Sequence, residues 1–253
     1  MSTPTDFRSE LNESQYEAVT YLDGPSLVIA GAGSGKTRVL TYKIAYLLQH
    51  GIHPWNILAL TFTNKAAREM NLRISQICQD ISLGGMWSGT FHSIFARLLR
   101  IEHEVINYPQ DFTIYDSADT KSLIKAITKE LGLDEKVYKQ NIVAGHISEA
   151  KNHLILPAQY AAESTIISRD RSEGVAQIHK IYTIYQQRLS AAGAMDFDDL
   201  LLNTYLLLRD HLDVRQRYIE RFQYILVDEY QDTNMAQYQI CLLYTSDAAD
   251  DLI

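Results

Sequence analysis

The sequence predicts an α/β protein built on a parallel sheet, with an all-α segment inserted between two of its strands. Three observations carry this prediction. Residues 26–37 and 57–77 each read as a short apolar strand, a turn and a helix, which is the repeating unit of a parallel sheet. Residues 108–193 show only helical spacing of apolar residues. Residues 224–227 (YILV) then return to a buried strand, so the helical segment interrupts the sheet.

In the first unit, Asn12 is expected to cap a helix that stops before Gly24. Residues 26–30 (SLVIA) are expected to form a buried strand, because a short apolar run is typical of strands in parallel sheets. A glycine-rich turn and a helix follow, and Gly51 suits the C-terminal end of that helix.

In the second unit, residues 57–62 are expected to form a strand and Asn64 to cap a helix that runs to about residue 77. In the helical segment, apolar residues at positions 123, 124, 127 and 131 predict one helix. Another helix is predicted by positions 178, 181, 182, 185 and 189. A further helix is expected to begin after Asp196.

Composition and cysteine usage exclude several classes. In 253 residues, 46% are apolar and 21% charged, which is ordinary for a globular protein and excludes disordered or collagen-like chains. The two cysteines, Cys78 and Cys241, have no metal-site spacing, so we expect no zinc and a reducing compartment. Neither a signal peptide nor a membrane span is visible, and we expect a cytoplasmic protein.

Charge is unevenly distributed along the chain. The net charge is −8, yet residues 36–101 carry eight basic and two acidic residues. A polyanion would meet a favourable face if folding brought that segment to one surface. The alternative is that these charges are simply solvated helix surfaces.

Residues 30–37 (AGAGSGKT) match the phosphate-binding P-loop pattern, except that Ala30 stands where the strict form has glycine. Small residues let backbone N–H groups turn toward a phosphate at the positive end of a helix. Lys36 would reach the β- and γ-phosphates and Thr37 would bind Mg²⁺. The alternative is a turn that merely joins strand to helix. The candidate phosphate-binding residues are Ala30, Gly31, Ala32, Gly33, Ser34, Gly35, Lys36 and Thr37.

Asp228 and Glu229 follow the strand at 224–227, where a P-loop protein needs carboxylates for its metal and its attacking water. Asp228 is the predicted metal ligand, and Glu229 is the predicted catalytic residue together with Lys36. The alternative is that the two acids favour the N-terminus of the next helix. The long interval between Lys36 and Asp228 requires an insertion, which the helical segment supplies.

These motifs, in this order, resemble those of the UvrD/PcrA/Rep-type DNA helicases of superfamily 1. The resemblance covers about residues 8–240. It rests on residues 11–19 (LNESQYEAV), the P-loop with its trailing Arg38, residues 61–67 (TFTNKAA), 89–93 (GTFHS) and 228–234 (DEYQDTN). Residues 196–201 (DFDDLL) also match a family signature, to which no chemistry is assigned.

The resemblance implies roles for further residues. It implies that Gln15 reads adenine and that Arg38 is ATP-binding, although Gln15 could equally close a capping box with Asn12. It implies single-strand DNA contacts by Phe62, Thr63, Asn64, Thr90 and His92. Phe62 could instead be core, and the threonines, Asn64 and His92 could cap helices and turns. Lys65 and Arg68 could be plain surface charges.

The resemblance also implies an ATP- and Mg²⁺-dependent motor that moves 3′ to 5′ on single-stranded DNA, meeting duplex junctions and proteins of replication or repair. It implies a RecA-like P-loop domain 1A with an inserted helical subdomain 1B and an incomplete C-terminal part. The expected division is 8–107 (1A), 108–193 (1B), 194–240 (1A) and 241–253, a tail that resembles translated adapter sequence.

Because the family's second lobe and its arginines do not follow, the piece alone is expected to bind nucleotide but to be nearly inactive as an ATPase. Two alternatives stay open. One is the helicase portion of a recombination-repair helicase-nuclease, and the other is a non-motor nucleotide-binding module.

Overall fold

The computed structural model describes residues 6–31, 33–78 and 82–245. The chain forms two compact units. Unit 1 comprises the residues up to 94 together with residues 216–232, and unit 2 comprises residues 95–215 and those from 233 onward. Helices α5 (Phe91–Ile101) and α12 (Leu212–Arg221) each pass from one unit to the other along the sequence.

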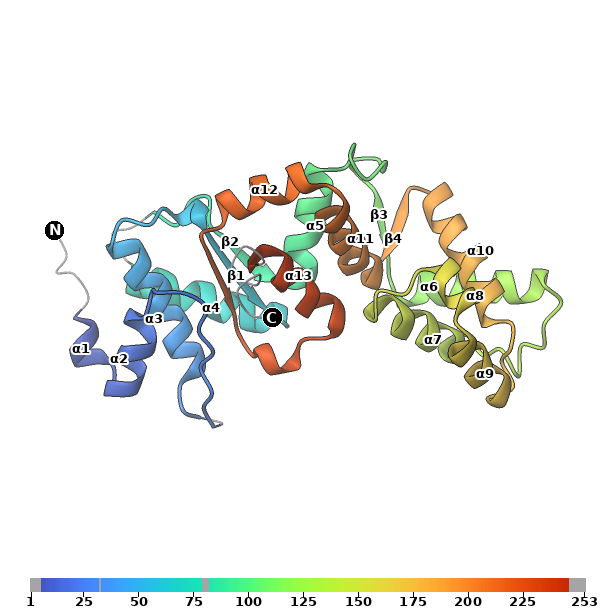
Figure 1. Cartoon of the computed structure of the whole chain (residues 1–253), viewed down its shortest axis with the longest axis horizontal. Coiled ribbons are helices and arrows are strands. Elements are labelled where there is room, and N and C mark those ends of the chain that lie inside the picture. Colours follow the sequence, from blue (N-terminus) through green and yellow to red (C-terminus); the bar gives the residue numbers. More distant parts are fainter. Residues whose placement is uncertain (1–5, 32, 79–81, 246–253) are drawn as a thin grey trace. The chain divides into compact units, whose positions relative to one another are not determined.

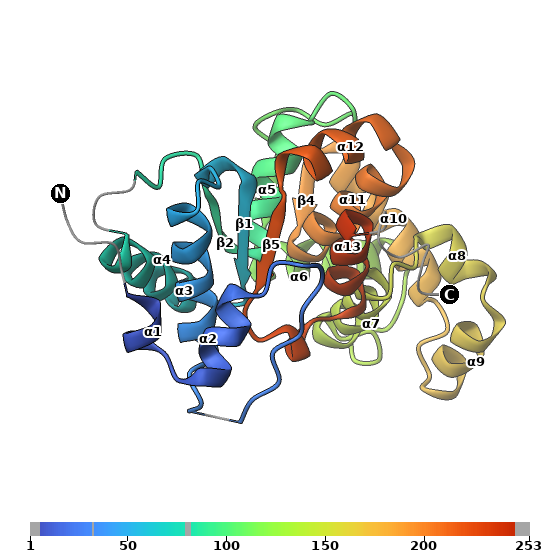
Figure 2. The ribbon, with the colours of Figure 1, turned by 60° about the vertical axis from the view of Figure 1, so that its left-hand side comes forward.

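Unit 1 holds a three-stranded parallel sheet in the order β2 (Trp87–Thr90), β1 (Ile57–Thr61) and β5 (Tyr224–Val227). Figure 1 labels β1 and β2, and Figure 2 shows β5 beside β1. The central strand β1 is buried along its whole length, whereas β5 is half-buried. Thr61 pairs with Thr90 and Leu60 with Val227. The carboxyl ends of all three strands therefore meet at one edge, where open α/β sheets bind their ligands.

Four helices accompany this sheet: α1 (Phe7–Glu10), α2 (Glu13–Thr20), α3 (Lys36–Gln49) and α4 (Asn64–Ile77). Helix α3 packs against both α2 and α4, and Figure 2 shows α3 and α4 on one side of the strands. The shared core is mainly aliphatic and includes Val19, Ile44, Leu47, Ile57, Ala59 and Ile74. A short 3₁₀ helix, η1 (Pro54–Asn56), leads into β1, and η2 (Tyr230–Asp232) follows β5.

Local sequence signals set most of these boundaries. Asn12 caps α2 as predicted, because its side chain accepts the Gln15 N–H at 2.9 Å. Gly51 lies just beyond α3 with φ of 87°, a conformation that favours glycine, and this prediction is also confirmed. The predicted cap of α4 is wrong by one residue. Thr63 is the N-cap and accepts the Ala66 N–H, while Asn64 is the first helical residue.

The prediction of a buried strand at residues 26–30 is wrong. This segment has no strand structure, and Figure 2 draws it as coil. Leu27 is 67% exposed and Ile29 is 87% exposed. The physical reason is that β-branched residues form a strand only beside another strand, and no described strand pairs with this segment. The prediction at 224–227 is confirmed as β5, although that strand is half-buried because it lies at the sheet edge in the described chain.

Unit 2 is mostly helical. Its helices include the two that apolar spacing predicted, here α6 and α10. The helices that lie wholly within the described part of unit 2 are α6 (Ser117–Glu130), α7 (Gln140–Asn152), α8 (Pro157–Ala162), α9 (Ser164–Ser172), α10 (Ile178–Ala191), α11 (Phe197–Asp210) and α13 (Met235–Thr245). The core between α6, α7 and α10 includes Ile124, Ile127, Val143, Ile147, Ile181 and Tyr182. Helix α11 begins after Asp196, as predicted.

The expectation of helices alone within 108–193 is wrong at one place. Strand β3 (Thr113–Tyr115) pairs in parallel with β4 (Ala194–Asp196), and Thr113 lies opposite Ala194. Three residues are too few to show an alternating pattern, which is why the sequence does not reveal the strand.

The compact units divide the chain at 94/95, 215/216 and 232/233, whereas the sequence pattern places the boundaries of the helical segment at 107/108 and 193/194. Helix α11 contacts α7 and α13, which is why it groups with the helical unit. The functional domain boundaries stay a prediction. Of the predicted tail, residues 241–245 continue α13, and residues 246–253 lie outside the described residues.

Candidate functional site

The glycine-rich turn lies directly before α3 in unit 1. Gly33 and Gly35 adopt φ of 77° and 88°, which side chains other than glycine rarely tolerate. A Cβ atom at Gly35 would lie 2.9 Å from Gln15 Nε2, so a side chain at this position would displace the Gln15 amide. The Ser34 side chain closes the turn by donating to the Gly31 carbonyl at 2.6 Å. The predicted phosphate-binding residue Ala32 lies outside the described residues.

Gln15 satisfies both interpretations that its sequence position allowed. Its side-chain oxygen accepts the Asn12 N–H at 3.2 Å, which completes a capping box. Its Nε2 donates to the Ser34 carbonyl at 3.0 Å, which joins α2 to the glycine-rich turn. The capping role therefore holds Gln15 in place beside the turn. Reading of a base by Gln15 stays a prediction.

The side chains that begin α3 point toward the turn and toward the end of β5. Lys36 Nζ donates to the Ala30 carbonyl at 3.1 Å, so the ammonium group lies over the turn. Thr37 Oγ1 lies 3.4 Å from Asp228 Oδ2, although the two residues are 191 positions apart in the sequence. The Asp228 N–H donates to the Leu60 carbonyl, which extends the β1–β5 ladder by one residue. The fold thus brings the glycine-rich turn and the acidic pair together.

The acidic pair has unusual electrostatics and backbone geometry. Burial raises the pKa of Asp228, and the neighbouring Glu229 carboxylate raises it further. Hydrogen bonds from the Glu229 backbone and Thr37, and the charge of Lys36, partly offset this rise. Glu229 has φ of 51°, a left-handed conformation that is uncommon for residues other than glycine. Gln231 Nε2 donates to Glu229 Oε2 and so orients that carboxylate.

The donor set fits Mg²⁺. Thr37 offers a hydroxyl and Asp228 a carboxylate, and both are the hard oxygen ligands that Mg²⁺ takes. Within the described residues no group of three or more His, Cys, Asp or Glu side chains is arranged to hold a metal.

A pocket of about 410 Å³ lies beside Gly35, between α3 and α4. Its wall is fixed by Arg38, which donates to the Glu10 carbonyl at 2.8 Å and lies 4.8 Å above the Tyr42 ring. The Tyr42 hydroxyl donates to Glu10 Oε2 at 3.1 Å. The pocket is lined by Gly35, Arg38, Thr41, Tyr42, Arg73, Gln76 and Ile77.

Sequence reasoning missed Tyr42, Arg73 and Gln76 as pocket residues. Tyr42 lies one helical turn after Arg38, and this spacing could have identified it. Arg73 and Gln76 belong to α4, and nothing local in the sequence relates them to the glycine-rich turn.

The residues predicted to contact DNA lie at the carboxyl edge of the sheet. Phe62 follows β1 and Phe91 follows β2, and their ring centroids are 5.4 Å apart. Phe62 and His92 are half-buried, whereas Asn64 is exposed. Thr63 caps α4, and the buried Thr90 accepts the Ser93 N–H, so both threonines have the capping role that was the alternative. DNA contact by any of the five residues stays a prediction.

Several of the basic residues in 36–101 have local structural roles. Lys43 donates to the carbonyls of Ala18 and Tyr21 and so completes the end of α2. Burial lowers the pKa of Lys43. Arg73 pairs with Glu69 one turn before it on α4. Lys65 and Arg68 are exposed on the same helix. Part of the positive charge of residues 36–101 is therefore used in contacts within the protein.

A glycine-rich turn before a helix, with an acidic pair after a parallel strand beside it, has the features of the P-loop class of nucleotide-binding proteins. The model of the UvrD/REP helicase N-terminal domain matches residues 11–251, and the chain belongs to this family.

Three similar proteins, each named ATP-dependent DNA helicase PcrA, come from Leuconostoc citreum, Staphylococcus aureus (strain NCTC 8325 / PS 47) and Bacillus subtilis (strain 168). Their identities to this chain are 44% over 231 residues, 45% over 239 and 46% over 233. The matches cover 91%, 94% and 92% of this chain but only 30%, 32% and 31% of the relatives. In the described part of the chain, no helix is long and apolar enough to cross a membrane.

Proposed function

We propose that this chain is the ATP-binding part of an ATP-dependent DNA helicase that moves 3′ to 5′ on single-stranded DNA. The single observation that carries the proposal is the contact between Thr37 and Asp228. It gives the P-loop helix and the acidic pair a shared ligand position, which is what a nucleotide-bound Mg²⁺ requires. In this proposal unit 1 is part of a RecA-like domain, and the helical segment is inserted into it.

The nucleotide would lie along the N-terminus of α3. Backbone N–H groups of the glycine-rich turn and the positive end of the helix would hold the phosphates, and Lys36 would move from the Ala30 carbonyl to the β- and γ-phosphates. The pocket beside Gly35 would take the base. Gln15 lies next to Gly35, which lines the pocket, and Arg38 lines the pocket as well. An adenine in the pocket could therefore hydrogen-bond to Gln15 and stack on Arg38.

The acidic pair would carry out hydrolysis. Bound Mg²⁺ supplies positive charge beside the transferring phosphoryl group. Asp228 and Thr37 would hold that ion, whose charge would offset the burial and the neighbouring Glu229 carboxylate that raise the pKa of Asp228. Glu229 would orient a water molecule and accept its proton. Gln231 keeps the Glu229 carboxylate in one orientation.

Single-stranded DNA would contact the carboxyl edge of the sheet, where Phe62 can stack on a base. The direction of movement, the contacts with duplex junctions and with repair or replication proteins, and a cytoplasmic location are carried by family membership alone. The two alternatives make different predictions. A helicase-nuclease would show nuclease activity in the full-length protein, and a non-motor module would retain its function after Lys36→Ala.

The proposal is tested with the full-length protein in an unwinding assay on partial duplexes that carry either a 3′ or a 5′ single-stranded tail. We expect ATP- and Mg²⁺-dependent unwinding of the 3′-tailed duplex only, and its loss after Lys36→Ala. Unwinding of the 5′-tailed duplex would reverse the assigned direction. Unwinding that survives Lys36→Ala would exclude this nucleotide site as the motor.

Phe62→Ala in the full-length protein is expected to weaken single-strand DNA binding by about 1–3 kcal/mol, because one stacked base is lost. The dependence of the binding constant on salt should stay the same, since no charge is removed. Fluorescence anisotropy with a labelled oligonucleotide at several salt concentrations measures both quantities.

Lys65→Ala and Arg68→Ala provide the matched comparison, because both side chains are exposed on α4. If either contacts a phosphate, the slope of log K against log salt should fall by about 0.7. Unchanged affinity after Phe62→Ala would remove the stacking role.

A further inference from the structure

Two arginines line the pocket beside Gly35, and each of them is paired with a carboxylate of unit 1. Arg38 Nη2 lies 3.1 Å from Glu10 Oε2, and Arg73 pairs with Glu69. A pocket whose positive charges are neutralised in this way has little net charge to attract a free phosphate. It suits an uncharged planar group, because the flat guanidinium of arginine can stack on a ring.

Lys36 is in a different setting at the same nucleotide site. Its Nζ donates to a neutral acceptor, the Ala30 carbonyl, at 3.1 Å. A carbonyl does not cancel the charge of the ammonium group, so Lys36 can still attract phosphate over the glycine-rich turn. The positive groups of this site are therefore of two kinds, a lysine suited to the phosphates and neutralised arginines suited to the base.

Glu10 holds the Arg38 side chain through a small network. Arg38 Nη2 donates to the Glu10 carbonyl at 2.8 Å as well as to the carboxylate. The Tyr42 hydroxyl donates to the same carboxylate oxygen at 3.1 Å, and Arg38 Cζ lies 4.8 Å above the centre of the Tyr42 ring. Burial and Glu10 raise the pKa of Tyr42 against the opposing charge of Arg38, so the hydroxyl stays protonated and donates. The Glu10 carboxylate thus fixes both the arginine and the ring beneath it.

Glu10 ends helix α1, and buried apolar residues on both sides hold it in place. Phe7 is buried, and its ring lies edge-on to the Tyr42 ring at 6.2 Å. Leu11, the residue after Glu10, is also buried. The side chains of Glu10 and Arg38 are themselves 50% and 43% exposed, and an ion pair as exposed as this contributes little to stability. Its value lies in the orientation of Arg38.

We propose that Glu10 is a positioning residue for the base of ATP. It holds the Arg38 guanidinium over Tyr42 on one side, so that the opposite side is ready to stack on the base. It also cancels the charge of the arginine, so that the pocket takes the base and not a phosphate group. This inference rests on the proposed function, in which the pocket beside Gly35 takes the base.

The test compares Mg·ADP with Mg·pyrophosphate, which has no base, as competitors of a fluorescent nucleotide on the full-length protein. Glu10→Ala is expected to weaken ADP binding about two- to tenfold, because Arg38 must then be ordered when the base binds. Pyrophosphate affinity should not fall, since its contacts are with the glycine-rich turn and Lys36. In DNA-stimulated hydrolysis, KM for ATP should rise by a similar factor while kcat is unchanged. Glu10→Gln should lie between wild type and Glu10→Ala, because an amide oxygen can still accept from Arg38 and Tyr42.

Tyr42→Phe tests the network from its other side, because it keeps the ring below Arg38 but removes the hydroxyl that donates to Glu10. It should also weaken ADP binding alone. Combined with Glu10→Ala, it should cause less than the product of the two losses, since both changes act on the same arginine. Glu13→Ala is the matched control, because Glu13 forms an exposed ion pair with Arg8 and neither residue lines the pocket. It should leave both affinities unchanged.

The outcomes separate this inference from the proposed function. Equal losses of ADP and pyrophosphate affinity in Glu10→Ala would indicate a disturbed glycine-rich turn and would overturn the positioning role. Wild-type ADP affinity in Glu10→Ala would overturn it as well. If Glu10→Ala does not fold, Glu10→Gln and Tyr42→Phe are judged by the same two criteria. A wild-type protein that binds neither ADP nor ATP would instead refute the proposed function.

Discussion

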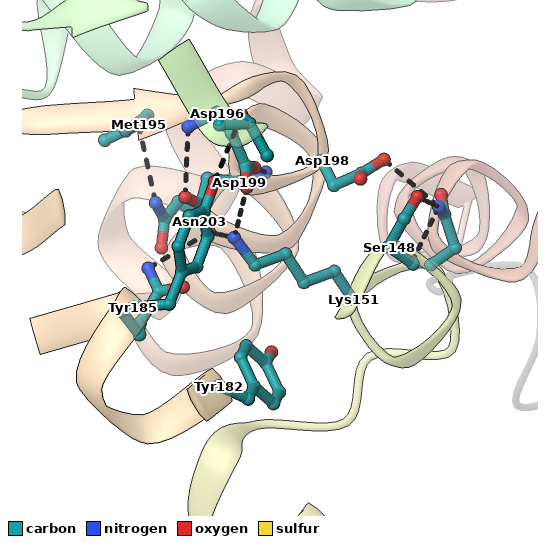
Figure 3. Close-up of polar contacts among 12 residues, drawn as sticks. Ser148, Lys151, Tyr182, Tyr185, Met195, Asp196, Asp198, Asp199 and Asn203 are labelled. Carbon is teal, nitrogen blue, oxygen red and sulfur yellow. Dashed lines mark hydrogen bonds and ion pairs between the residues drawn. The ribbon is translucent and has the colours of Figure 1, made fainter. Parts of the chain in front are cut away.

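Replacing Lys151 with methionine is expected to destabilise unit 2 by about 3–5 kcal/mol, because the variant leaves buried carboxylates without their cation. Lys151 is fully buried between Asp196 and Asp199 (Figure 3). Burial alone would raise the pKa of Asp196, but the Lys151 charge and several hydrogen bonds lower it on balance. For Asp199 burial outweighs the same lysine and raises the pKa to about 6.

The measurement is amide hydrogen exchange of α7 and α10 in the full-length protein, which reports local unfolding free energy. Lys180→Met is the matched control, since Lys180 is exposed on α10, and it should have no measurable effect. The Lys151→Met defect should be smaller at pH 5 than at pH 8. Without the lysine, both carboxyl groups have a raised pKa and are more fully protonated at the lower pH, so less unpaired charge is buried. Equal exchange in the wild type and Lys151→Met would mean that the ion pairs contribute nothing to stability.

Glu229→Gln in the full-length protein is expected to reduce DNA-stimulated ATP hydrolysis by about 10²–10⁴-fold, the contribution of a positioned general base. Glutamine keeps the shape of the side chain but cannot accept the proton of the attacking water. ATP affinity should change little, because the predicted phosphate and base contacts involve other residues. Single-turnover hydrolysis and equilibrium binding of a fluorescent nucleotide separate the two effects.

Glu220→Gln makes the same chemical change at an exposed carboxylate on α12 and should leave hydrolysis at the wild-type rate. A Glu229→Gln variant that turns over within a few-fold of wild type would assign the proton acceptor to another group. Asp228 would then be the next candidate, since burial raises its pKa.

Much of the fold could be predicted because it depends on short-range chemistry. Asn12 and Gly51 act within one helical turn, and the structure has both where the sequence placed them. The approach of Thr37 and Asp228 spans 191 positions and was predictable only because each lies in a motif that needs the other. Periodicity alone carries no information about such a contact.

The features that escaped prediction depend on distant partners. Lys151 has the sequence context of an ordinary surface lysine, and its partner Asp196 is 45 positions away. Arg73 lines the pocket beside Gly35 from a different helix, and no local pattern indicates it. The segment at 26–30 was mistaken for a strand because its residue types fit one, whereas a strand also needs a neighbour to pair with.

The half-buried strand β5 and the bare side chains of Leu27 and Ile29 have a practical consequence for anyone who produces these residues in isolation. Among the described strands β5 is at the edge of its sheet, and an edge strand can pair with a strand of another chain, while exposed apolar side chains such as Leu27 and Ile29 favour association. Aggregation during purification would then result from the β5 edge strand and these apolar side chains rather than from misfolding of the nucleotide site.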